Sequence, residues 1–287
     1  MSTAYIIAIA HESGGVGRTT TTLHLGYELA RLGQRVCLVD LDPSGDLSRR
    51  LGLTPSAPTL AAALVADGDP PLPQPCRWDG IGLDVVPNDS DLIMAELLVT
   101  DLPQARERHL EGVLRSWRAQ YDLVLLDCPA PKGLLLVNAL NAADGVLIPL
   151  QTQDKAYAAL ARTAATIAAV WEYHNLAILG YLLTMTSHSN ADRAIIAAVQ
   201  ADFPALVFRA AIPRRVEATL DGRILPHQRG GGGLPRSGRG SAGPCAGAAH
   251  ARDLTRARPP LPLPTGYRPA AGARYLECSG LSAPPAG

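Results

Sequence analysis

The sequence is almost without lysine, since Lys132 and Lys155 stand against 24 arginines in 287 residues. Arginine has GC-rich codons and lysine does not, so this imbalance is typical of a GC-rich gene. No run of 18 or more apolar residues occurs, which excludes a transmembrane helix. The first residues lack the basic segment of a secretory signal, so we expect no export.

Paired cysteines are also missing. The five cysteines are scattered, odd in number and without a Cys-x-x-Cys pair, which argues against a disulfide framework and a zinc site. They are Cys37, Cys76, Cys128, Cys245 and Cys278. Reduced thiols in a cytoplasmic protein are the interpretation that this pattern favours.

The formal net charge of zero conceals two unequal parts. Residues 228–287 hold eight arginines against Asp253 and Glu277, a net charge of +6 that leaves −6 on residues 1–227. The same stretch has 12 Gly and 9 Pro and no Val, Ile, Phe, Met or Trp, too little apolar surface to offset the entropy of ordering. We therefore expect a disordered tail, which is either natural or the product of a frameshift in GC-rich DNA.

Residues 1–227 show short apolar runs that alternate with helical patterns. This alternation predicts one α/β domain, a doubly wound and mostly parallel sheet with helices on both faces. Strands are expected at 4–10, 35–41, 83–86, 121–127, 145–150, 178–184 and 207–212. Helices are expected at 20–32, 59–65, 104–119, 156–171 and 191–201.

A glycine-rich segment, Ser13-Gly14-Gly15-Val16-Gly17-Arg18-Thr19-Thr20, lies between the first strand and the first helix. Glycines in this position let successive backbone N–H groups face phosphate oxygens, and the following helix adds its positive end. A cation after the last glycine and a hydroxyl next to it suit the β- and γ-phosphates and Mg²⁺. The alternative is an ordinary strand–helix turn, because arginine replaces the expected lysine.

Carboxylates end two of the predicted strands. Asp40 and Asp42 follow the strand at 35–41, and Asp127 closes the strand at 121–127. Parallel strands present their carboxyl ends at one edge of the sheet, where ligands bind. Each acid alone could be a helix cap, but the three together with the loop favour a site for Mg²⁺ and a water molecule.

Five segments together resemble the ParA/Soj type of deviant Walker-A ATPase, a relative of MinD, over residues 4–226. They are GGVGRTTTT, VDLDPSGDLS, YDLVLLDCPAPKGLLLVNALNAADGVLIPLQ, ILGYLLTM and AIPRRV. The resemblance implies a P-loop NTPase fold, ATP and Mg²⁺ as cofactors, and a homodimer formed with ATP. It also implies non-specific DNA binding, a ParB-like centromere-binding partner and a cytoplasmic, nucleoid-associated location.

The resemblance also implies roles for single residues. The loop residues Gly14, Gly15, Val16, Gly17, Arg18 and Thr20 would bind the phosphates. Thr19 would ligate Mg²⁺, while Asp40 and Asp127 would hold its waters. Asp42 would serve catalysis by orienting the attacking water, and Arg18 would serve it as the cation beside the phosphates. Pro213 and Arg214 would lie against the adenine.

Two positions depart from the family pattern. The signature lysine of the family is Ser13 here, and the ordinary P-loop lysine is Arg18, whose planar guanidinium is not equivalent to an ammonium. Lys155, at the start of a predicted helix, is a candidate replacement for the signature lysine, and Lys132 is the second candidate. A solvated lysine is the alternative at either position.

DNA contacts in this family come from scattered basic residues late in the domain, for which Arg193, Arg209, Arg214 and Arg215 are available. The alternative is that these arginines are only solvated. The Gly/Pro-rich tail cannot form the amphipathic membrane helix of MinD, so we expect no membrane partner. A degenerate nucleotide switch with little hydrolysis, or an ATPase that positions another cargo, remains an alternative to partitioning.

Overall fold

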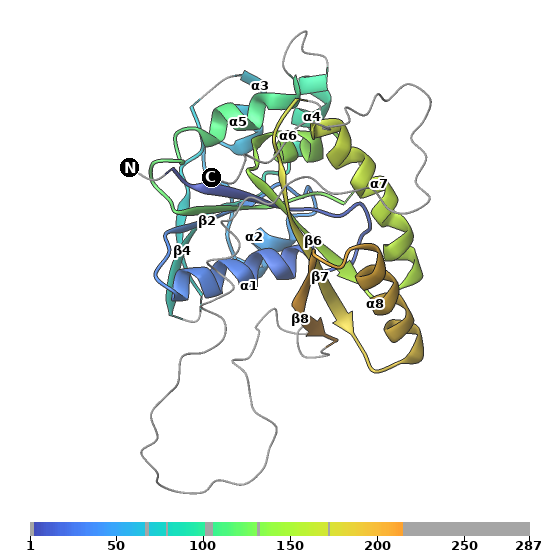
Figure 1. The fold of residues 1–287 in the computed structure, drawn as a ribbon. Coiled ribbons are helices and arrows are strands. Elements are labelled where there is room, and N and C mark those ends of the chain that lie inside the picture. Colours follow the sequence, from blue (N-terminus) through green and yellow to red (C-terminus); the bar gives the residue numbers. More distant parts are fainter. Residues whose placement is uncertain are drawn as a thin grey trace, which may run out of the picture.

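The computed structural model describes residues 3–66, 69–78, 80–100, 106–130, 133–171 and 173–214, and its strands form a single eight-stranded sheet (Figure 1). In chain order they are β1 Tyr5–Ile9, β2 Val36–Asp40, β3 Gln74–Trp78, β4 Ile81–Val86, β5 Leu123–Asp127, β6 Gly145–Gln151, β7 Ala177–Thr186 and β8 Val207–Pro213. Their order in the sheet is β3-β4-β2-β5-β1-β6-β7-β8. Only the β3–β4 pair is antiparallel, which confirms the predicted mostly parallel sheet.

Helices cover both faces of this sheet. They are α1 Arg18–Arg31, α2 Asp46–Leu51, α3 Leu60–Ala66, α4 Leu92–Thr100, α5 His109–Leu114, α6 Leu134–Ala142, α7 Asp154–Trp171 and α8 Asn190–Asp202, with a 3₁₀ turn at Arg106–Arg108. Figure 1 shows α1 and α2 on one side of the sheet and α3 to α6 on the other. This arrangement is the doubly wound α/β fold that the sequence predicts.

The core is divided by the sheet, because successive side chains of a strand point to opposite faces. In β1, Ile6 and Ala8 pack into the larger cluster with α3 to α8, whereas Ile7 and Ile9 pack into the smaller cluster with α1 and α2. All four are at most 1% exposed. The central strand is therefore fixed from both sides, and the loop that follows it starts from a rigid base.

The helix expected at residues 104–119 is wrong as a single element. Among its described residues only His109–Leu114 is α-helical, preceded by the 3₁₀ turn. The chain then turns at Trp117, which is 2% exposed, and the Arg118 guanidinium bonds to the Ala4 carbonyl and to Asp144. These long-range contacts override the helical pattern of the sequence.

Some sequence expectations fall on residues outside the described ranges. These are the tail at 228–287, the domain boundary at 227, Lys132 and Arg215. Within the described residues, no helix has the length and apolar character needed to cross a bilayer.

Candidate functional site

The glycine loop joins the carboxyl end of β1 to the first turn of α1. Gly15 has φ +75° and Gly17 has φ +91°, left-handed values at which a Cβ would be strained. Gly17 is the N-cap of α1, so the helix begins directly at Arg18. The first N–H groups of a helix lack intrahelical partners, and here they follow a tight glycine turn, an arrangement suited to an anion.

Two contacts fix the shape of this loop. The Thr184 hydroxyl on β7 donates a 2.7 Å hydrogen bond to the Val16 carbonyl, and the Ser13 N–H donates to His11 Nδ1 at 2.9 Å. His11 is fully buried, and desolvation with the nearby Arg18 charge lowers its pKa to about 4. A neutral imidazole therefore supports the loop at neutral pH.

Arg18 turns its guanidinium back onto the loop. Nη1 donates to the carbonyls of His11 at 2.8 Å and Ser13 at 2.9 Å, and Nη2 lies 3.3 Å from Asp42 Oδ2. The side chain is only 8% exposed. Arg18, which the sequence predicts to bind phosphate, thus also holds the loop closed. It pairs with Asp42, the carboxylate that is predicted to serve catalysis.

Asp40 and Asp127 lie side by side, because they are register partners at the ends of β2 and β5. Asp40 Oδ2 accepts from the Ser48 backbone N–H at 2.9 Å and from its hydroxyl at 2.6 Å. Asp127 accepts from the hydroxyls of Thr19 and Thr22. The rule that parallel strands end at one edge correctly predicts this pair.

Burial makes both carboxylates unfavourable as anions. Desolvation raises the pKa of Asp40 to about 6, and desolvation followed by the charge of Asp40 raises that of Asp127 to about 8. Among the described atoms, Asp40 Oδ1, Asp127 Oδ2 and the hydroxyl of Thr21 are buried without a hydrogen-bond partner. Two unpaired carboxylate oxygens next to each other are what a divalent cation would neutralise.

This donor set fits Mg²⁺. Magnesium prefers oxygen ligands and usually keeps several waters, so it needs only one or two protein carboxylates. No cage of three or more His, Cys, Asp or Glu side chains is found in the part of the chain that the structure describes. The fully buried Cys128, adjacent to Asp127, is free.

Asp42 lies in the loop that follows β2. Its Oδ1 accepts from the Ser44 N–H at 3.0 Å, its backbone carbonyl accepts from Asn88 Nδ2 at 2.7 Å, and Oδ2 pairs with Arg18. The loop is therefore tied to both the glycine loop and the segment after β4. In this structure Arg18 and the Ser44 N–H each engage one oxygen of the Asp42 carboxylate.

The other predicted residues are more dispersed. Lys155 is exposed in the first turn of α7, just after the carboxyl end of β6. Pro213 ends β8, and the Arg214 N–H donates to the Thr186 carbonyl at the same edge of the sheet. Arg193 on α8 and Arg209 on β8 are exposed and do not join the cluster of acids.

Several residues that shape the site escape sequence reasoning. Glu12 accepts from the Thr166 hydroxyl on α7, while its N–H donates to Thr163 Oγ1. Met185, at φ +52°, lies with its Cε 3.8 Å from where a Cβ on Gly17 would be. Of these residues, only Glu12 could have been predicted from the sequence, because it directly precedes the glycine loop.

A family model described as an AAA domain matches residues 4–179. The chain is 38% identical to the chromosome partitioning protein ParA of Caulobacter vibrioides, over 75% of this chain and 82% of that protein. It is 35% identical to the sporulation initiation inhibitor protein Soj of Bacillus subtilis, over 78% of this chain and 93% of that protein.

Two solved structures are also similar to this chain. Cobyrinic acid a,c-diamide synthase from Mycobacterium smegmatis, with bound ADP and magnesium, has a TM-score of 0.67 at 34% identity, covering 74% of this chain and 87% of that one. The septum site-determining protein MinD from Pyrococcus horikoshii, with Mg-ADP, has a TM-score of 0.60 at 26% identity, covering 76% and 86%. With the glycine loop and the strand-end acids in place, these likenesses show that the chain belongs to the ParA/MinD superfamily of P-loop ATPases.

Proposed function

We propose that this protein is a Mg²⁺-dependent ATPase of the ParA type that acts in chromosome or plasmid partitioning. It forms a homodimer with ATP, binds DNA non-specifically and responds to a ParB-like centromere-binding partner. The relatives named ParA and Soj support the process, and the bound nucleotides and magnesium of the similar structures support the cofactors.

The observation that carries the proposal is the meeting of a left-handed glycine loop with two unpaired carboxylate oxygens. Gly17 opens α1 toward an anion, while Asp40 and Asp127 present oxygens without partners among the described residues. Mg²⁺, when bound, would neutralise charge on the β- and γ-phosphates. Thr19 would ligate it, with the two acids holding its waters.

The remaining residues position the reactants. The residues that hold the phosphates are Gly14, Gly15, Val16, Gly17, Arg18 and Thr20. Asp42 orients the water that attacks the γ-phosphorus, and this requires Arg18 to exchange the Asp42 carboxylate for phosphate oxygens. Pro213 and Arg214 lie against the adenine. Because phosphoryl transfer depends mainly on positioning and charge neutralisation, these contacts account for the catalysis.

A second candidate is a nucleotide switch with little turnover. The ion pair between Arg18 and Asp42 favours it, since this pair keeps the water-orienting carboxylate engaged. In this case the protein would bind ATP and dimerise, while hydrolysis would be too slow to separate the dimer.

Phosphate release under steady-state conditions separates the two candidates. The full chain is measured with saturating Mg-ATP, with and without DNA, beside Asp42→Ala. For an ATPase, we expect wild type to release phosphate at least tenfold faster than Asp42→Ala, and the variant to accumulate as an ATP-bound dimer on size exclusion. Equal rates with intact ATP binding would identify the switch, and absence of ATP binding would contradict both.

A further inference from the structure

Helix α4 is apolar apart from Glu96 and Thr100, although only one side of it is buried. Leu92, Ala95 and Val99 face the core, while Ile93, Met94, Leu97 and Leu98 are 55, 56, 58 and 50% exposed. We name these last four residues the α4 stripe. They are half of the large hydrophobic side chains that are exposed in the described part of the chain. A helix that is hydrophobic all round is normally buried, so the stripe indicates a covered surface.

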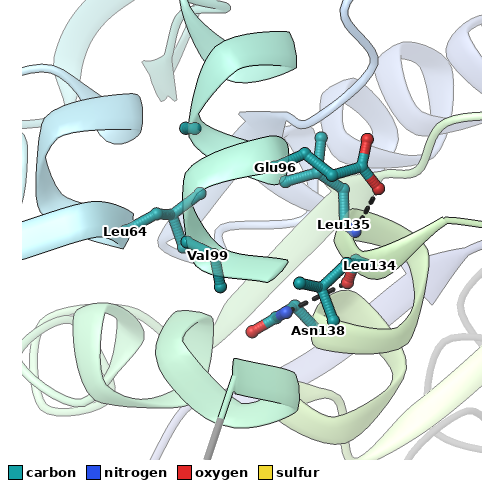
Figure 2. Close-up of a pocket in the computed structure, with 7 residues that line it drawn as sticks. Leu64, Glu96, Val99, Leu134, Leu135 and Asn138 are labelled. Carbon is teal, nitrogen blue, oxygen red and sulfur yellow. Dashed lines mark hydrogen bonds between the residues drawn. The ribbon is translucent and has the colours of Figure 1, made fainter. Parts of the chain in front are cut away.

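The inner side of α4 is already filled. Figure 2 shows Leu64 of α3, Glu96 and Val99 of α4, and Leu134, Leu135 and Asn138 of α6 around a small cavity. Its volume of about 10 Å³ is at most that of one water molecule. The α4 stripe therefore cannot be buried by a shift of the helix toward α3 and α6, because their side chains already fill the space beneath it.

Both acid loops of the nucleotide site are tied to α4. Glu96 Oε1 accepts from the Leu135 N–H at 3.0 Å, at the start of the helix that follows the Asp127 loop (Figure 2). At the other end, Asn88 in the segment before α4 donates to the Asp42 carbonyl at 2.7 Å. The helix that carries the α4 stripe is thus connected by hydrogen bonds to both acid loops of the proposed nucleotide site.

We propose that the α4 stripe is a self-contact of the ATP-bound dimer, in which α4 of one copy packs against α4 of a second copy. This inference rests on the proposed function. Nucleic acid and anionic lipid are poor occupants, because α4 carries no Lys, Arg or His and Glu96 is turned inward to cap α6. A two-fold contact brings identical side chains together, so it favours a surface without charge.

The size of the stripe explains why the contact would depend on nucleotide. At about 25 cal/mol per Å², the roughly 1.5–3 kcal/mol for burying one such side chain corresponds to about 60–120 Å². Four half-exposed side chains therefore offer roughly 120–240 Å² per copy. A stable interface needs about 800 Å² per partner. The stripe alone is too small to hold a dimer, and the remaining contacts must come from the nucleotide edge.

A charge at the centre of the stripe tests the proposal. Leu97→Glu and Leu97→Lys are compared with wild type by analytical ultracentrifugation in a non-hydrolysable ATP analogue, while a fluorescent ATP analogue reports nucleotide affinity. We expect each variant alone to dimerise at least tenfold more weakly, with nucleotide affinity within twofold of wild type.

An equimolar mixture of the two variants should dimerise again. In a self-contact the two copies meet at the same position, so a mixed dimer sets the introduced acid of one copy against the introduced amine of the other. Leu72→Glu, at a 74% exposed position in a different segment of the chain, is the matched control and should dimerise like wild type.

Two results would overturn the inference. If Leu97→Glu dimerises like wild type, the stripe does not form the dimer contact and instead binds another protein or nothing. If both variants fail to dimerise and their mixture also fails, the stripe is not in contact with its own copy. Phosphate release by wild type is measured in parallel, so a failure of the ATPase proposal is seen separately from a failure of this surface.

Discussion

At the scale of single residues, Arg18 has two competing sets of partners. Its guanidinium holds two loop carbonyls and Asp42, whereas in the proposed function the same group contacts phosphate when nucleotide binds. A lysine has one compact ammonium and cannot span these partners at once. We expect Arg18→Lys to raise kcat several-fold in the phosphate-release assay, because Asp42 is no longer held by a rigid fork.

The control is Arg31→Lys, which changes an exposed ion pair with Glu28 at the far end of the same helix. It should leave kcat unchanged. An Arg18→Lys enzyme that is as slow as wild type or slower would mean that the pocket has adapted to the guanidinium.

The buried His11 makes stability depend on pH. Burial, and then the charge of Arg18, lowers its pKa to about 4, against about 6.5 in an unfolded chain. Between these values the unfolded state binds a proton that the native state does not, so the free energy of unfolding falls as pH falls. The contribution of His11 between pH 7 and pH 5 is about 2 kcal/mol.

His11→Asn keeps an acceptor for the Ser13 N–H and removes the titrating group. Urea unfolding at pH 7 and pH 5 should therefore show a smaller loss of stability at pH 5 than in wild type. His188→Asn, at an exposed position, should retain the wild-type difference. The same pH dependence in His11→Asn and wild type would argue against a neutral buried imidazole.

At the scale of elements, Gly180 shows where close packing needs a glycine. It lies in β7 at φ +145°, and a Cβ there would clash with the Leu206 carbonyl oxygen, which is backbone and cannot move aside. We expect Gly180→Ala to lower the free energy of unfolding by about 2 kcal/mol or more. In chemical denaturation, Gly82→Ala on β4, where nothing lies within 4 Å, should cost far less. Equal costs would show that β8 can shift away from β7.

Lys155 lies in the first turn of α7, at the edge of the sheet that carries the glycine loop. Because Ser13 carries no charge, a dimer closing over two triphosphates would need another cation. We expect Lys155→Ala to weaken ATP-dependent dimerisation about tenfold with little change in monomer nucleotide affinity. Lys132→Ala, the alternative lysine, should dimerise normally. The reverse pattern would assign the role to Lys132, and two normal dimers would mean that neither lysine replaces the signature residue.

Most elements with a clear sequence pattern were predicted, apart from the helix expected at residues 104–119, whereas several elements without such a pattern were missed. Strands β1, β2 and β5 are apolar runs ended by glycine or acids, so their places and the convergence of Asp40 and Asp127 could be predicted. Helices α4 and α6 are apolar nearly throughout and lack a polar face, which removes the helical pattern. Strand β3 contains Pro75 at the sheet edge, where proline is tolerated but weakens the strand pattern.

The details of the site depend on tertiary contacts that no local pattern encodes. The Ser48 hydrogen bonds to Asp40 and the Asn88 bond to Asp42 come from segments further along the chain. The ion pair of Arg18 with Asp42 also joins residues 24 positions apart. The residue types indicated which groups meet at the site. The orientation of the Arg18 side chain toward the loop carbonyls and Asp42 depends on tertiary packing, which the sequence pattern does not encode.

At the scale of the whole molecule, the net charge of the larger part of the chain has the same sign as DNA and does not attract it. Residues 1–227 carry a net charge of −6, so binding of DNA would have to come from local basic groups and from the +6 of residues 228–287. Arg193 and Arg209 are exposed on α8 and β8. Each phosphate contact releases counterions from the DNA. The slope of the logarithm of the binding constant against the logarithm of the salt concentration therefore reports the number of these contacts.

We therefore expect DNA affinity to fall steeply with salt, and the logarithmic slope to identify the contributing cations. Replacing both Arg193 and Arg209 by alanine should flatten the slope by about 2, and removal of residues 228–287 should flatten it further. Fluorescence anisotropy with two unrelated duplexes at several salt concentrations measures both slope and specificity. Arg49→Ala, which removes an exposed arginine paired with Asp46, is the control and should leave the slope unchanged. An unchanged slope in the double variant would mean that α8 and β8 do not face DNA, and binding would then depend on the C-terminal arginines alone.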